Sequence, residues 1–165
     1  MKTIVVILLL ALFPRVSALS QAPAQSGGKF SLAGLDDREV EQFFISFKEA
    51  VAKNDKKKVA SLTAFPVGVY LASGRRTNIK SEADLLSKYD QIFDETFKRV
   101  ISQTEVKDLW ANWQGVAMPN GEIWINGIIR DAKRLEKYTI KITTINGPIR
   151  PDQSHKSKLG KSSPR

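Results

Sequence analysis

The stretch NWQGVAMPNGEIWING, residues 112–127, decides the fold that the sequence predicts. From residue 109 onward the apolar residues recur at every second position, which is the signature of β-strands. Asn120-Gly121 interrupts the alternation, and this dipeptide strongly favours the two-residue turn of a β-hairpin. The sequence therefore predicts two antiparallel strands joined at this turn, with Val116 facing Ile125.

This register sorts the hairpin residues onto two faces, because neighbours along a strand point to opposite sides of the sheet. A three-residue loop would shift one strand and lose the match between its apolar residues and those of the other strand. One face is predicted to hold Gln114, Val116, Met118, Ile123 and Ile125. The other is predicted to hold Trp113, Ala117 and Trp124.

Two amphipathic helices are predicted before the hairpin. Asp36 with Glu39, and Ser81 with Asp84, have the spacing of a capping box, in which each side chain satisfies a free backbone N–H. The second helix is predicted to run without a break to Ile101. The apolar face of the first helix comprises Val40, Phe43, Phe44, Phe47 and Val51.

The remaining elements are shorter. Residues 55–65, DKKKVASLTAF, predict a short helix that Pro66 ends, because proline cannot continue the hydrogen-bond ladder. Residues 67–71 and residues 135–146 predict strands. This order indicates an α+β fold of one domain, with N-terminal helices packed on a strongly curved antiparallel sheet.

Two motifs in this order resemble a known superfamily. A YDQIF helix, residues 89–93, precedes the QG…NGEIW hairpin, and together they resemble the nuclear-transport-factor-like and ketosteroid-isomerase-like superfamily. The likeness covers residues 35–146 and is closest to small exported members of unassigned function. It implies a cone-shaped, cystatin-like sheet wrapped around helices, a cavity at the open end, and a dimer formed through the outer sheet face.

The residues that catalysis would need are scarce in the predicted fold. Catalytic members of the superfamily place an aspartate, a tyrosine or an aspartate-histidine pair inside the cone. The only histidine of this chain, His155, follows the predicted fold, and the chain has no cysteine. A histidine base, a histidine metal ligand and a cysteine nucleophile are thereby excluded from the cavity. The sequence predicts no catalytic residue, no metal site and no cofactor.

A ligand cavity is predicted next to the first face of the hairpin. Gln114 either bonds a neighbouring backbone group or points into the cavity, since a buried amide must be satisfied. Tyr89 either packs in the core or presents its hydroxyl at the cavity rim. The predicted lining is Gln114, Tyr89, Val116, Met118, Ile123, Ile125 and Tyr70.

The second hairpin face carries tryptophans that need a cover. Trp113, Trp124 and Ala117 are therefore predicted to form a homodimer interface, with a cover by the linker or the tail as the alternative. Trp110, just before the first strand, is predicted to lie in the core.

The chain ends predict export and a cationic tail. Residues 1–18 have the single basic residue, apolar run and small-residue motif of a signal peptide, with cleavage after Ala18 or, as the alternative, Ser20. Export to the periplasm or the medium follows, without a membrane anchor after cleavage. Residues 19–34 read as a flexible linker and residues 147–165 as a basic disordered tail. Because that tail contains no aromatic residue, no specific nucleic-acid partner is predicted.

The leading hypothesis is an exported, non-catalytic domain that binds a small apolar or amphipathic ligand, or a peptide, in the cone. Two alternatives stay open. One is an isomerase or dehydratase that uses a buried tyrosine and an aspartate. The other is an interaction protein that acts through the basic tail.

Overall fold

The computed structural model describes residues 27–71, 75–129 and 138–148. The predicted signal peptide, the linker up to residue 26 and the tail from residue 149 lie outside these residues. The chain enters its fold earlier than predicted, because Phe30 is 1% exposed and belongs to the hydrophobic core. Asp37 accepts hydrogen bonds from the N–H groups of Lys29 and Phe30, both at 2.9 Å, and so holds this segment. The predicted domain start at residue 35 is therefore too late.

Helix α1 (Asp37–Ala52) follows the short 3-10 helix η1 (Ser31–Ala33) and begins at the predicted cap. Asp36 accepts a hydrogen bond from the Glu39 N–H at 3.0 Å. The Asp36 N–H, which a full capping box would bind to the Glu39 side chain, donates instead to the Tyr138 hydroxyl at 3.0 Å. The helix cap thus connects to the segment leading into the last strand. The helix buries Val40, Phe44, Phe47, Ala50 and Val51.

Pro66 does not end the second helix. Helix α2 (Lys56–Ser61) stops earlier, and strand β1 (Thr63–Tyr70) begins two residues later with Pro66 inside it. The pairing of β1 with the last strand is irregular between Thr63 and Gly68. A residue without an N–H is tolerated in a strand where the ladder is interrupted.

The predicted long helix is two helices, α3 (Glu82–Ile92) and α4 (Glu95–Gln103). Phe93 leaves helical geometry with φ −100° and ψ 63°. Asp94 then caps α4 by accepting a hydrogen bond from the Phe97 N–H at 2.8 Å. An aspartate three residues before a free N–H favours a new helix start, and this local bond overrides the continuous apolar pattern. The break leaves the rings of Phe93 and Phe97 stacked at 5.5 Å.

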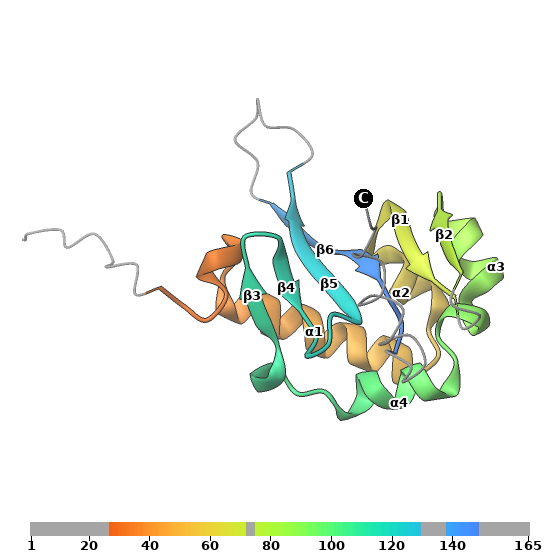
Figure 1. Ribbon diagram of the computed structural model, residues 1–165, viewed down its shortest axis with the longest axis horizontal. Helices are drawn as coiled ribbons and strands as arrows, with labels where there is room; N and C mark the ends of the chain where they lie inside the picture. The colour runs from red at the N-terminus through yellow and green to blue at the C-terminus, as the bar shows by residue number, and fades with distance from the viewer. Residues whose placement is uncertain (1–26, 72–74, 130–137, 149–165) are drawn as a thin grey trace, which may run out of the picture.

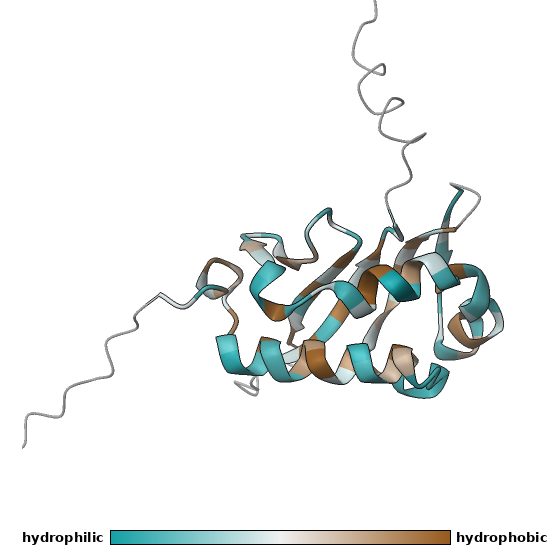
Figure 2. Ribbon diagram, turned by 90° about the horizontal axis from the view of Figure 1, so that it is seen from below, coloured by the Kyte–Doolittle hydropathy of each residue, from teal (hydrophilic) through white to brown (hydrophobic). Residues whose placement is uncertain are grey.

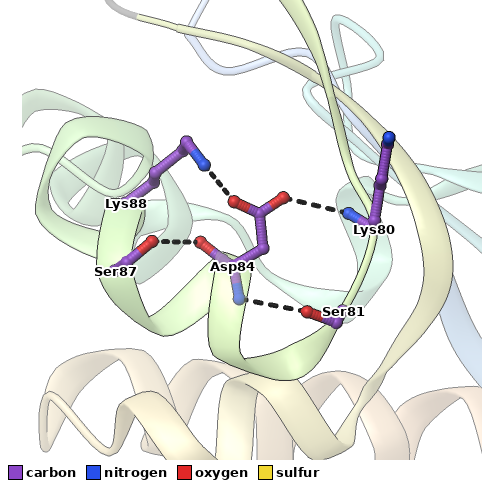
Figure 3. A network of polar contacts seen from close by, with 5 residues as sticks. All are labelled: Lys80, Ser81, Asp84, Ser87 and Lys88. Carbon is purple, nitrogen blue, oxygen red and sulfur yellow. Dashed lines mark hydrogen bonds and ion pairs between the residues drawn. The ribbon is translucent and has the colours of Figure 1, made fainter.

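The start of α3 is a polar network around Asp84 (Figure 3). Ser81 accepts a hydrogen bond from the Asp84 N–H at 3.3 Å, as predicted. The Asp84 carboxylate accepts from the Lys80 N–H at 3.1 Å and pairs with the Lys88 ammonium through its other oxygen. The Lys88 hydrogen bond, followed by the Lys80 N–H, holds the pKa of Asp84 below its ordinary value. The capping box is therefore displaced by one residue toward the N-terminus.

Six strands form one mixed sheet in the order β2-β1-β6-β5-β4-β3 (Figure 1). Strands β1 and β6 run parallel, so the prediction of a fully antiparallel sheet is wrong at this pair, although the α+β class is confirmed. Before the hairpin the chain forms a second short 3-10 helix, η2 (Val106–Asp108). The other strands are β2 (Arg76–Ile79), β3 (Trp110–Asn112), β4 (Gly115–Ala117), β5 (Ile123–Ile128) and β6 (Thr139–Ile145).

The predicted hairpin register is confirmed, but the predicted two-residue turn at Asn120-Gly121 is wrong. The Gly121 N–H donates to the Met118 carbonyl at 2.8 Å, so Pro119 and Asn120 form the centre of the turn. Val116 pairs with Ile125, Ala117 pairs with Trp124, and the Met118 N–H donates to the Ile123 carbonyl at 3.1 Å. Helix α1 runs behind strands β3, β4 and β5 in the view of Figure 1, so the core lies between it and the sheet. Hydrophilic and hydrophobic segments alternate along the helices in Figure 2, as expected of helices with one buried face.

Candidate binding face

One row of residues crosses all six strands on the side of the sheet away from the core. The strand pairings place side by side Asn78, Gly68, Thr144, Trp124, Ala117 and Trp110. Their strand neighbours Val69, Val116 and Ile125 are fully buried and point to the opposite side. We call this side the outer face, and no helix of the described residues covers it in Figure 1. All six residues of the row are uncharged.

Trp110 and Trp124 close over Ala117. The two tryptophans belong to strands on either side of β4, about 10 Å apart. Their rings nevertheless meet edge to face, with centroids 5.3 Å apart, because Ala117 between them has only a methyl group. The Trp110 indole N–H donates to the carbonyls of Met118 and Pro119 at 3.0 and 3.2 Å. Ala117 is consequently buried, while Trp110, predicted in the core, is 38% exposed on the outer face.

Trp113 and Gln114 form the turn between β3 and β4, since Asn112 pairs with Gly115. Trp113 is 83% exposed at this turn and is not part of the row. Gln114 is exposed, so its predicted place among the buried residues of the inner face is wrong. The alternation of strand residues ends at the turn, where Asn112 Oδ1 accepts a hydrogen bond from the Gln114 N–H at 2.7 Å. The Asn before this turn and the Gly after it were the signal that could have indicated it.

Gly115 is required where β4 begins. Its φ is +137°, and a Cβ there would lie 2.6 Å from the backbone oxygen of Ile125. The Asn126 side chain donates to the Gln114 carbonyl at 2.9 Å and holds the turn over β5. Gln114 therefore lies beside the outer face, where it reaches residues of β5 and β6.

An open hollow of about 270 Å³ lies at this place, lined by Gln114, Trp124, Thr143 and Thr144. Thr143 donates its hydroxyl to the Trp124 carbonyl at 3.4 Å. Within the described residues, no hydrogen bond engages the Gln114 side-chain amide, the Trp124 indole N–H or the Thr144 hydroxyl. The hollow thus combines an aromatic ring with uncommitted donors and acceptors, all of them neutral.

A second open hollow, of about 390 Å³, is lined by Gly68, Arg76, Thr77 and Asn78. Gly68 pairs with Thr144 of the first hollow, so the two hollows are neighbours on the outer face. The Arg76 guanidinium carbon lies 5.9 Å from the ring centre of Tyr70. Tyr70, a predicted cavity residue, is exposed beside Arg76 and lies on the same side of β1 as Gly68.

The other predicted cavity residues are fully buried in one continuous core. They are Tyr89, Val116, Met118, Ile123 and Ile125. The side of the hairpin predicted to face inward is therefore correct for the four aliphatic residues. The ligand cavity predicted among them stays a prediction.

Tyr89 is the polar exception in this core. Its ring stacks on Phe93 at 4.8 Å, and the Lys56 ammonium lies 5.3 Å from its ring centre. Its hydroxyl is buried without a hydrogen-bond partner among the described residues. Burial, with smaller contributions from Asp90 and Asp55, raises the pKa of Tyr89 to about 12. The phenol therefore stays neutral at ordinary pH.

Glu122 is a buried carboxylate that the sequence reasoning missed. It is 2% exposed and lies directly after the hairpin turn. Its two oxygens accept hydrogen bonds from the Asn120 backbone N–H at 3.0 Å and from the Asn120 amide at 2.9 Å. The Asn146 N–H donates to the Glu122 carbonyl at 2.7 Å. The position of Glu122 two residues after the turn Asn was the available signal, and its role is to hold the turn.

A groove between α1 and α4 has a volume of about 470 Å³. Its lining is Lys48, Val51, Ala52, Asn54, Glu95, Lys98, Arg99 and Ser102. Lys48 donates to the Thr104 carbonyl at 2.5 Å, and Lys98 pairs with Glu95 at 3.1 Å. Two of its three cations are thus already bound within the protein.

Comparisons with known proteins leave the family open. No protein-family model matches the chain, and no curated protein or solved structure matches it. The resemblance to the nuclear-transport-factor-like superfamily stays a prediction. In the described residues, no group of three or more His, Cys, Asp or Glu side chains could hold a metal ion. None of the helices found there has both the length and the apolar character that crossing a bilayer requires.

Proposed function

We propose that this chain is an exported, non-catalytic binding domain that holds its ligand on the outer face of the sheet. The observation that carries the proposal is the hollow at Trp124, where an indole ring lies beside amide and hydroxyl groups with no partner in the described residues. Binding sites commonly join an apolar surface to a few polar groups that orient the ligand. The inner face, in contrast, presents only side chains already buried in the core.

The chemistry of the two buried oxygen groups supports binding rather than catalysis. Tyr89 has a pKa of about 12, so at neutral pH it is protonated and offers almost no phenolate that could act as a base. Both carboxylate oxygens of Glu122 already accept hydrogen bonds from Asn120. Neither group is arranged to exchange a proton with a substrate.

The superfamily resemblance belongs to this proposal. The sheet continues from the edge strand β2 through β1 to β6, and α1 lies behind the hairpin. This arrangement is compatible with the cone-shaped, cystatin-like form that the resemblance implies. Export through the predicted signal peptide would bring the outer face into contact with extracytoplasmic material.

Tryptophan fluorescence tests the proposal, because all three tryptophans of the chain lie on the hairpin or just before it. We would titrate the full chain with three probes: a pentamer of N-acetylglucosamine, an amphipathic Leu/Lys peptide and lauric acid. At least one probe is expected to shift the emission, with binding weakened about tenfold or more in Trp124→Ala. The proposal would be contradicted if none of the three probes binds. It would also be contradicted if each probe that binds the wild type binds Trp124→Ala with the same affinity.

A ligand in the interior is the second candidate, and the unpartnered Tyr89 hydroxyl favours it. A small apolar molecule with one acceptor could satisfy that hydroxyl. Lauric acid would then bind in a manner that Tyr89→Phe weakens and Trp124→Ala leaves unchanged. The opposite pattern of the two variants would reject the interior site.

A further inference from the structure

We propose that the outer face binds a neutral carbohydrate chain, with Trp124 as the stacking platform and Gln114 and Thr144 as hydrogen-bonding groups. This inference rests on the proposed function and names the ligand class of the same site. Sugar rings present C–H groups on their faces and hydroxyls around their rims. A protein that binds them needs a flat aromatic surface next to groups that can both donate and accept hydrogen bonds.

The first hollow supplies these two kinds of group together. Trp124 is half-buried, so its ring is fixed by Trp110 on one side while part of it remains open. The Gln114 amide offers two donors and an acceptor, and the Thr144 hydroxyl offers both functions. None of these groups is engaged within the described residues, so a ligand would not have to break an existing bond to reach them.

The second hollow extends the site along the row. Asn78, Gly68, Thr144 and Trp124 succeed one another on four neighbouring strands. Three strand spacings correspond to about 14 Å, which is longer than one sugar ring. Gly68 has no side chain of its own, and the Arg76 guanidinium lies over it, 3.4 Å from the position that a Cβ would take. A chain that crosses from one hollow to the other would therefore pass over Arg76. The geometry therefore fits a chain of several rings better than a monosaccharide.

The charge of the row favours a neutral ligand. The whole chain carries a formal charge of +9, yet the six residues of the row and the lining of the first hollow carry none. The second hollow contains the Arg76 guanidinium, which lies 5.9 Å from the ring centre of Tyr70. An anionic polymer would gain more from the lysine-rich surfaces elsewhere. A second copy of the chain, pressed flat on this face, would bury the Gln114 and Thr144 side chains, and buried polar groups without partners are costly. A polyhydroxylated ligand brings a partner for each of them.

Isothermal titration calorimetry and tryptophan fluorescence with three neutral pentasaccharides test this inference. The probes are the pentamer of N-acetylglucosamine, cellopentaose and maltopentaose. We expect at least one to bind, and Trp124→Ala to weaken that binding about tenfold or more. Gln114→Ala, a change at an exposed turn that leaves the fold intact, is expected to weaken it about threefold to tenfold. Ile45→Ala, an exposed apolar residue of α1, is the matched control and should bind as the wild type does.

The alternative results each overturn the inference. No binding of any pentasaccharide at millimolar concentration rejects it, as does binding that is equal in wild type and Trp124→Ala. If sedimentation shows a dimer that Trp124→Ala dissociates, the face is a self-interface instead. If the Leu/Lys peptide binds in a Trp124-dependent manner and the sugars do not, the binding-domain proposal stands and the carbohydrate assignment fails.

Discussion

The two faces of the β4–β5 hairpin are built from neighbouring residues but differ in how they are filled. On the inner face, Val116 and Ile125 are fully buried among the aromatic side chains of the helices. On the outer face, Ala117 is covered by two tryptophans that themselves remain partly open. The inner face is closed by packing, while the outer face keeps hollows beside small residues. The inner side thus supplies the packing that stabilises the fold, and the outer side is where the proposed ligand would bind.

The largest expected effect is on the inner face. Ile125→Ala should lower the free energy of unfolding by about 3 kcal/mol, because it removes buried methylene groups and leaves a cavity. Trp124→Ala, one residue away on the outer face, should lower it less, by about 2 kcal/mol, since part of its side chain is exposed. Urea denaturation of both variants measures the difference. Equal losses would remove the distinction between the two faces.

Enlarging Ala117 should disturb the outer face by overpacking. Ala117→Leu is expected to cost about 2 kcal/mol, because the larger side chain would occupy the space where Trp110 and Trp124 meet at 5.3 Å. Denaturation gives the loss, and near-ultraviolet circular dichroism reports the separation of the two indoles. Ala111→Leu, a partly buried alanine on β3, is the control. An unchanged tryptophan signal in Ala117→Leu would show that the pair does not depend on the small residue.

The raised pKa of Tyr89 should make the free energy of unfolding decrease at alkaline pH. Its pKa is about 12 in the folded chain and 10.0 without the fold. Between these values the unfolded chain releases a proton that the folded chain keeps, so stability is fully present below pH 10 and falls as the pH rises toward 12. At pH 11 this group is expected to make the free energy of unfolding about 1 kcal/mol lower than at neutral pH.

The control for this pH dependence is Tyr89→Phe. It should lack this part of the loss, and at pH 7 it should be as stable as the wild type or slightly more so, because the hydroxyl has no described partner. Denaturation of both proteins at pH 7 and pH 11 separates this group from the other tyrosines and the lysines. A strong loss of stability in Tyr89→Phe at pH 7 would reveal a hydrogen bond that the hydroxyl makes.

The smallest effect on stability is expected at Trp113, in the turn between β3 and β4. Trp113→Ala should change the free energy of unfolding by less than about 0.5 kcal/mol, since the side chain is 83% exposed. Thermal denaturation measures it, with Trp110→Ala as the comparison, because Trp110 donates to two carbonyls of the next turn. A loss for Trp113→Ala as large as that for Trp110→Ala would indicate that Trp113 is covered in solution.

The site could be predicted only in part. The hairpin register predicted that Val116 and Ile125 face the same way, and it predicted Trp124 on the other face. It failed for Gln114 and Trp113, because strand alternation was continued through a turn that Asn112 and Gly115 close. Trp110 was misplaced in the core because the residues it packs against lie on other strands. Its ring meets Trp124 over Ala117, with which it pairs.

The sequence by itself determined the features that depend on groups a few residues apart. The hairpin register and the helix starts at Asp36 and Ser81 belong here, because each is set by turn-forming residues or by a side chain bonded to a nearby N–H. The break between α3 and α4 at Asp94 follows the same capping rule. It was not predicted, because the apolar residues on both sides of it continue one helical pattern.

Only the tertiary structure decided which residues meet across the sheet. The parallel pairing of β1 with β6 brings Gly68 next to Thr144, although they are far apart along the chain. That pairing creates the row on the outer face, and the packing of α2 on α3 leaves Lys56 over Tyr89. Such contacts depend on which strands and helices become neighbours, and local side-chain chemistry carries no information about that choice.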